Sequence, residues 1–198
     1  MTDAREADRA FRKAVRFVAL ANLIYFFIEF VAGQVAGSVS LFADSIDFLE
    51  DAAVNLLVLL ALDWAPRARA RMGMTLAALL LVPSAAALWT GWTKLQAPVA
   101  PDPFILSIAG LGALAVNVVC SLRLASFRSS GGSLARAAFL SARNDAVANI
   151  AIIGAGLVTL VWASAWPDLI VGIAIAALNA GAAREVWEAA RGEHDAAP

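Results

Sequence analysis

The stretch Ser40–Leu60, SLFADSIDFLEDAAVNLLVLL, has the length and apolarity of a membrane-spanning helix, yet it contains four acids. These are Asp44, Asp47, Glu50 and Asp51. Each Asp near the centre of such a helix costs about 2.5–3.5 kcal/mol, so the acids should face a protein interior or a watery cavity and bind something positive. At about 100° per residue, the three aspartates share one helix face with Asn55, and Glu50 lies beside that face.

The rest of the chain is equally apolar. It has 198 residues, of which 61% are hydrophobic and 16% charged, and a mean hydropathy of +0.75, which is too apolar for an ordinary soluble domain. Apolar segments of membrane-spanning length recur at Val15–Val35, Ser40–Leu62, Met72–Trp92, Phe104–Leu124, Leu134–Trp162 and Pro167–Trp187. The sequence therefore predicts an all-α, polytopic membrane protein with six transmembrane helices.

The charged residues predict the domain limits and the orientation. Residues 1–14 form an N-terminal tail without features of a removable signal peptide, 15–188 the transmembrane domain, and 189–198 a short tail with no soluble C-terminal domain. Lys and Arg gather in the first sixteen residues and after the second and fourth segments, whereas the opposite connections contain only Lys94. The positive-inside rule then predicts cytoplasmic termini, in a cell (inner) membrane. The six tryptophans lie near segment ends, where indoles favour the membrane interface.

An internal repeat relates the two halves of the chain. Asp51-Ala-Ala-Val-Asn55 in the second segment matches Asp145-Ala-Val-Ala-Asn149 in the fifth, and Asn22 matches Asn117 at nearly the same offset. With three helices in each half, the two copies must run in opposite directions through the membrane. This predicts the inverted-repeat arrangement of secondary transporters, whose ion sites lie near the midplane at the repeat interface.

The repeat predicts a carboxylate site near mid-membrane, because the polar residues of both copies recur every four positions on one helix face. The predicted metal ligands are Asp47, Asp51, Asp145 and Ser141. Residues expected beside this site or along its pathway are Asp44, Asn55, Asn144, Asn149 and Glu29. Arg143 falls on the opposite side of its helix from Asp145 and is expected to reach the cytoplasmic surface or to pair with Glu50 or Glu29.

The charge of this site indicates its chemistry. Several carboxylates in contact cannot all stay ionised without a counter-ion. A divalent cation satisfies them, and protons do so when the cation leaves, so an exchange of metal for protons follows from the charge count. The sequence predicts a transporter rather than an enzyme, with no resident cofactor, and with lipid, divalent metal ions and protons rather than nucleic acid as partners.

Several motifs in order resemble the cation diffusion facilitator family. They are the segment from Asn22 through Glu29 to Gly33, GSVSLFADSIDFLED in the second segment, Asp145 in the fifth, and WPDLIVGIAIAALNA in the sixth. The resemblance implies efflux of divalent transition metals from the cytosol against protons. It also implies a site of Asp47 and Asp51 with an HxxxD pair in the fifth segment, whose second residue corresponds to Asp145.

The sequence departs from the family pattern in two places. Ser141 stands where the family has histidine, which leaves an all-oxygen site; oxygen ligands suit harder ions such as manganese, whereas imidazole favours zinc. The family's soluble C-terminal domain has no counterpart before the end of this chain, so a homodimer would have to form through the transmembrane helices.

Two other readings remain open from the sequence. Two aspartates on facing helices are also the arrangement of an intramembrane aspartyl protease, although the residues before Asp145 lack the GxGD-like segment of such enzymes. A proton-coupled carrier of a non-metal substrate, or a membrane scaffold in which Arg143 neutralises the acids, is the third reading.

Overall fold

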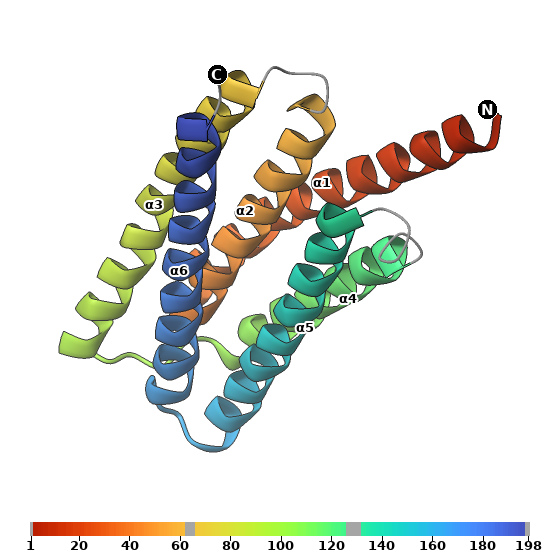
Figure 1. Ribbon diagram of the computed structural model, residues 1–198. Coiled ribbons are helices and arrows are strands. Elements are labelled where there is room, and N and C mark those ends of the chain that lie inside the picture. The colour runs from red at the N-terminus through yellow and green to blue at the C-terminus, as the bar shows by residue number, and fades with distance from the viewer. Residues whose placement is uncertain (1, 62–65, 126–131, 197–198) are drawn as a thin grey trace.

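The structure, a computed structural model, describes residues 2–61, 66–125 and 132–196, and these ranges contain six α-helices and no strands. The helices are α1 (Thr2–Ala36), α2 (Val39–Ala61), α3 (Pro66–Gln96), α4 (Pro103–Ala125), α5 (Gly132–Val161) and α6 (Trp166–Ala196) (Figure 1). Each predicted segment corresponds to one helix, so the predicted all-α, six-helix architecture is confirmed.

Helices α1, α3 and α6 are clearly longer than the apolar segments that predicted them, because charged residues continue each helix beyond the hydrocarbon. The charged N-terminal stretch is already helical from Thr2. In the same way, α3 begins at Pro66, so the Arg-rich stretch that we expected to lie between helices is part of α3. Proline is favoured there because the first helical N–H has no intrahelical partner.

The outer surface of the bundle is apolar, as a membrane protein requires. Three helical stretches in the described ranges are by length and composition able to cross a membrane, namely Arg9–Ala36, Pro103–Ala125 and Asn144–Val161. On α1 alone, Ile24 and Val35 are 61% and 69% exposed. Exposed apolar side chains are unfavourable in water, whereas the acyl chains of a membrane solvate them without that penalty. The chain is therefore a polytopic membrane protein.

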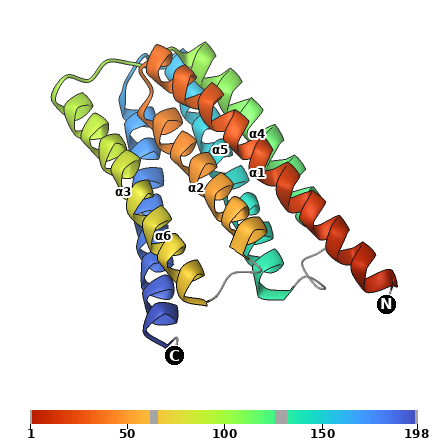
Figure 2. The same cartoon turned by 90° about the horizontal axis from the view of Figure 1, so that it is seen from above.

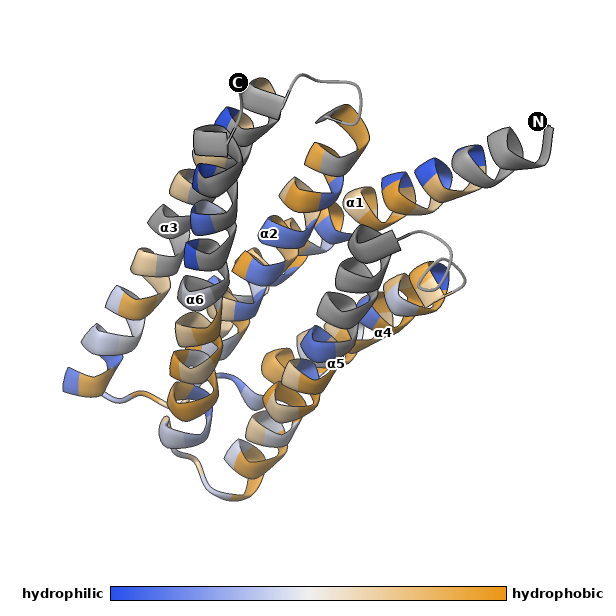
Figure 3. Cartoon of the chain, viewed as in Figure 1, coloured by the Kyte–Doolittle hydropathy of each residue, from blue (hydrophilic) through white to orange (hydrophobic). Residues whose placement is uncertain are grey.

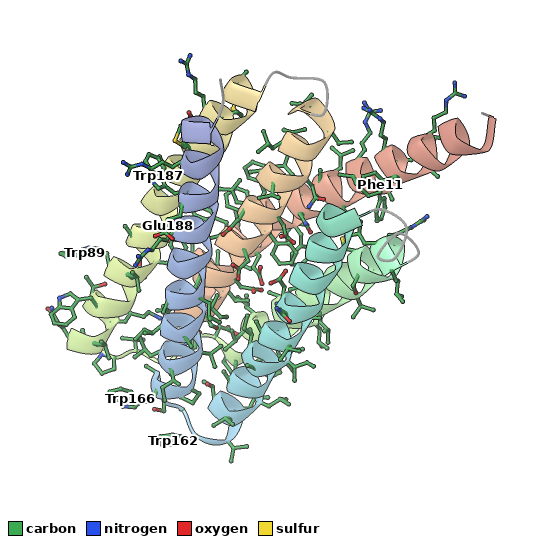
Figure 4. The ribbon with its side chains drawn as sticks, in the orientation of Figure 1. Phe11, Trp89, Trp162, Trp166, Trp187 and Glu188 are labelled. Atoms are coloured by element: carbon green, nitrogen blue, oxygen red, sulfur yellow. The ribbon has the colours of Figure 1, made fainter. Side chains whose placement is uncertain are left out.

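Exposed tryptophans mark the two ends of the bundle. Trp89, Trp162 and Trp166 lie toward one end, and Trp187 lies toward the other (Figure 4). Their indoles are 38–68% exposed. This placement agrees with the predicted anchoring at the membrane interface, except that Trp64 lies outside the described residues.

The two halves of the chain are built alike. Helix α1 packs on α2, and α4 packs on α5 in the same way, while α3 and α6 pair with each other. Each helix of the second half runs opposite to its counterpart in the first, as Figures 1 and 2 both show. In each half, a buried asparagine reaches across to the next helix: Asn22 to Asp51 and Asn117 to Asn149. This arrangement agrees with the inverted repeat expected from the sequence.

A tight turn joins α1 to α2 and sets the position of the acids. Gly37 has a φ of 62°, the only positive φ among the described residues. The N–H of Gly37 donates to the carbonyl of Gln34, and that of Ser38 donates to Gly33, which is the Schellman pattern that ends a helix. Helix α2 therefore starts directly at Val39, and the first acid follows little more than one turn later.

The apolar core surrounds this first part of α2. It includes Leu41 and Ile46 of α2, Leu106 of α4, Ile152 of α5 and Ile175 of α6, all of which are 0–3% exposed. With Ala36 of α1 and Ala87 of α3 in the same cluster, all six helices contribute to the core around the start of α2. The middle of α2, which carries the acids, packs closely on one side. The ionisable groups lie at the edge of the apolar core, where polar contacts begin.

Candidate metal site

Polar residues interrupt the apolar helices at one level of the bundle. Hydrophilic turns in the middle of α2 lie opposite hydrophilic turns on α5, within otherwise apolar helices (Figure 3). Side-chain oxygen atoms gather between the same two helices (Figure 4). The structure thus brings together the two helix faces whose matching patterns suggested a shared site.

Three aspartates meet across the gap between α2 and α5. The carboxyl group of Asp145 lies within hydrogen-bonding range of Asp51, and Asp145 is also an electrostatic neighbour of Asp47. All three residues are of intermediate exposure. We define Asp47, Asp51 and Asp145 as the aspartate triad. Carboxylates are the kind of group that binds hard divalent cations.

Neighbouring side chains hold Asp51 in place. The amide N–H of Asn22 in α1 donates a hydrogen bond to Asp51 Oδ2 at 3.3 Å. The thiol of Cys120 in α4 donates a weak hydrogen bond to the amide oxygen of Asn22 at 3.8 Å. Cys120 is buried, in agreement with the packing role expected from its apolar context. Asn55 donates to the backbone carbonyl of Asp51 at 2.8 Å, which turns its amide group back along its own helix.

Asp44 belongs to a separate, buried network that joins three helices. Its Oδ2 accepts a 2.6 Å hydrogen bond from the amide of Asn149 on α5, and the Asn149 oxygen accepts one of 3.0 Å from Asn117 on α4. Asp44, Asn149 and Asn117 are 0–2% exposed. Both polar ends of Asn149 are therefore occupied by protein groups, and Asp44 links α2 to α5 directly.

Glu29 of α1 also belongs to this buried network, but no group donates a hydrogen bond to its carboxyl oxygens. The side chain is 0% exposed, and neither carboxyl oxygen has a hydrogen-bond partner. Asp44 is its nearest charged neighbour, close enough for a hydrogen bond if one of the two groups is protonated, and Asp47 is the next. The structure thus places Glu29 beside the predicted site, although the sequence alone positions it only by helix and register.

The remaining predicted residues lie on α5. Ser141 and Arg143 belong to α5, but their side chains lie outside the described residues. The side chain of Asn144 is exposed and takes part in an interaction of its own. Among the described residues, no three His, Cys, Asp or Glu side chains are positioned to hold one metal ion together. The triad is therefore a convergence of carboxylates rather than a closed coordination sphere.

One polar residue at the start of α6 has a role that the sequence did not reveal. Asp168 is 0% exposed and accepts hydrogen bonds from the hydroxyl groups of Ser38 and Ser40, both at 2.6 Å. It also accepts from the backbone N–H groups of Val39 at 2.8 Å and Ser40 at 3.1 Å. The first N–H groups of a helix have no intrahelical partners, so Asp168 caps α2 from another helix. We call these contacts the Asp168 clasp.

The close approach of α6 to α2 makes the Asp168 clasp possible. A Cβ atom added at Gly172 would lie 2.7 Å from the backbone of both Val39 and Ser40, so only glycine allows this separation. The signals available in the sequence were the serines in GSVS, which are favoured helix caps, and the aspartate in WPDLIVG. Neither indicated that the two would bind each other.

Comparison with known proteins identifies the domain. The family model described as the cation efflux transmembrane domain matches residues 15–191, which is nearly the whole chain. A search of curated proteins found no match. The matched region includes every residue of the aspartate triad.

Proposed function

Since the chain belongs to the cation efflux family, whose transmembrane domain carries cations across membranes, we propose that it exports divalent transition-metal ions in exchange for protons through the aspartate triad. The observation that carries this proposal is the meeting of Asp145 with Asp51 and Asp47 between α2 and α5. Membership in a transporter family favours this function over the protease and scaffold readings.

The charges of the triad favour a divalent ion. Three carboxylates inside the bilayer repel one another and are costly unless a cation or protons neutralise them. A divalent ion neutralises two of the charges and brings the three groups together. We propose that one ion would be shared by carboxylates from both α2 and α5.

The ligand chemistry favours a hard ion. With serine in place of histidine at position 141, the proposed site offers oxygen donors only. Oxygen ligands suit manganese, whereas zinc gains most from imidazole and thiolate ligands. We therefore propose manganese as a better substrate than zinc, with Ser141 taking part in the site.

The proposed topology follows from the placement of the termini and the charges. Both described chain ends lie at the same end of the bundle (Figures 1 and 2), and Lys and Arg are concentrated there. We propose that this end is cytoplasmic, in the cell membrane, according to the positive-inside rule. Any homodimer is proposed to form through the exposed apolar faces of the helices.

The proposal is tested by transport in reconstituted vesicles. Uptake of manganese, iron, cobalt, zinc and cadmium is measured with a pH gradient for the wild type, Asp51→Ala and Asp145→Ala. The matched control is Asp102→Asn, which changes an exposed aspartate at the start of α4. We expect both triad variants to lose metal uptake and metal-dependent proton flux, and the control to keep them. Unchanged uptake of every metal in both triad variants would reject the site.

A further inference from the structure

The two carboxyl groups of Glu29 and Asp44 are sealed inside the bundle with too few hydrogen-bond donors. Both side chains are 0% exposed. Three of their four oxygens, Glu29 Oε1, Glu29 Oε2 and Asp44 Oδ1, have no hydrogen-bond partner. The fourth, Asp44 Oδ2, accepts the 2.6 Å bond from Asn149. Two ionised carboxylates in this position would be both desolvated and mutually repelling, which is among the costliest arrangements in a protein interior.

A single proton resolves this arrangement. If Glu29 is the protonated partner, its O–H donates to Asp44 Oδ1, and the only oxygen left without a partner is the Glu29 carbonyl. Asn149 favours this distribution, since its N–H bond to Asp44 Oδ2 stabilises the charged form of Asp44. Charge-assisted bonds between a carboxyl O–H and a carboxylate are short and strong. One proton thus removes one negative charge and satisfies two of the three unpartnered oxygens.

A metal ion does not fit the same place. Divalent cations need several oxygen ligands around them, and no three acids among the described residues are so arranged. The oxygen of Asn149 is already used as an acceptor from Asn117. Glu29 and Asp44 also approach within hydrogen-bonding range of each other, which suits a shared proton rather than an ion placed between them.

We infer that Glu29 and Asp44 together bind one proton, in a site of their own that is separate from the aspartate triad. The pair differs from the triad in burial as well as in geometry, because Glu29 and Asp44 are 0% exposed whereas the triad residues are of intermediate exposure. The proton site joins α1 to α2 and, through Asn149, to α5.

The groups around this pair couple the proton to the metal. Tyr25 on α1 is close to both carboxyl groups, but its hydroxyl donates to the carbonyl of Ala109 at 2.6 Å. Helix α2 contributes Asp47, and α5 contributes Asp145, which is an electrostatic neighbour of Asp44. Helix α4 presents the neutral Asn117. A cation in the triad would therefore repel the proton on the pair, and each would weaken binding of the other. This coupling rests on the proposed metal function, whereas the proton site does not.

Infrared spectroscopy of the metal-free, reconstituted protein tests the site directly. A protonated carboxyl group has a carbonyl band distinct from that of a carboxylate. Because protons on the aspartate triad contribute similar bands, each variant is compared with the wild type by difference spectroscopy. At neutral pH, we expect Glu29→Gln to lack one carbonyl component that the wild type shows, and Asp44→Asn to shift that component, because Glu29 then loses its carboxylate acceptor. Asp102→Asn, at an exposed position, should retain it. Elution as a monodisperse species in gel filtration shows that each variant is folded. Wild-type spectra in both Glu29→Gln and Asp44→Asn would overturn the inference.

The coupling is tested by counting the protons that manganese displaces from purified protein in weakly buffered detergent solution. We expect Glu29→Gln to bind manganese but release about one proton fewer than the wild type. Equal proton release would overturn the coupling. If the wild type binds no divalent ion, the transport proposal fails, while the infrared result still decides whether Glu29 and Asp44 hold a proton.

Discussion

The Asp168 clasp makes a quantitative prediction about stability. Replacement of Asp168 by alanine removes the acceptor of four hydrogen bonds and leaves two buried serine hydroxyls and two backbone N–H groups at the start of α2 without this partner. Hydrogen bonds to a charged group contribute about 1.5–3 kcal/mol each, but bonds to one carboxylate are not additive. Each buried neutral donor left without an acceptor costs about 1–3 kcal/mol, and four donors lose theirs here. We therefore expect Asp168→Ala to lose about 3–5 kcal/mol, less than the sum because the four bonds share one carboxylate.

The assay is thermal unfolding of the purified protein in detergent, followed by tryptophan fluorescence. For chains of this length, 1 kcal/mol corresponds to about 2–4 °C in melting temperature, so Asp168→Ala should melt more than about 6 °C below the wild type. Asp168→Asn, which keeps one side-chain oxygen and the same shape, should fall between the two. A melting temperature for Asp168→Ala within about 1 °C of the wild type would refute the reasoning, because the clasp would then contribute nothing to holding α2.

Other residues give further predictions. Gly172→Ala should destabilise the protein by about 1–3 kcal/mol in the same melting assay, because a Cβ would lie 2.7 Å from the backbone at the start of α2. Gly154→Ala is its control, since no atom of a neighbouring helix lies within 4 Å of the added Cβ, and it should be neutral or more stable; equal losses in both would contradict the close approach. Tyr25→Phe should cost about 1 kcal/mol through loss of its bond to Ala109, and an unchanged melting temperature would count against that bond. Ser141→His should shift uptake from manganese toward zinc, whereas an unaltered metal profile would place Ser141 away from the ion.

The helices could be predicted from the sequence because membrane-length apolar segments have almost no alternative structure. A segment such as Phe104–Leu124 must satisfy its backbone hydrogen bonds internally when it lies in lipid, so its position in the sequence predicts a helix. The helix ends were less predictable. Helix α3 continues through Arg-rich sequence to Pro66, since charged residues form helix as readily as apolar ones.

The aspartate triad was foreseeable for a similar reason. Charges are so costly in hydrocarbon that Asp51 and Asp145 had to face the protein interior, and the repeat indicated which helix faces meet. Their convergence follows from residue type and helical register alone. The ligand set itself remains a prediction, since the side chain of Ser141 lies outside the described residues.

The buried networks could not be predicted, because they depend on the packing of distant helices. The Asp168 clasp requires α6 to pass within backbone contact of α2, which no local pattern encodes. The pairing of Glu29 with Asp44 likewise depends on how far α1 and α2 rotate against each other after the turn at Gly37. Hydropathy indicates that such acids are inside, but only the packed structure shows which groups lie against them.

The most direct test of the transport account is equilibrium binding of manganese to the purified protein at neutral pH, measured by dialysis for the wild type, Asp51→Asn, Asp145→Asn and Asp102→Asn. The aspartate triad predicts that the wild type and Asp102→Asn bind alike. It also predicts that each triad variant binds more than about tenfold more weakly, a loss of about 1.4 kcal/mol or more. Equal affinity in all four proteins, or no binding by the wild type, would contradict the assignment of the triad as the metal site.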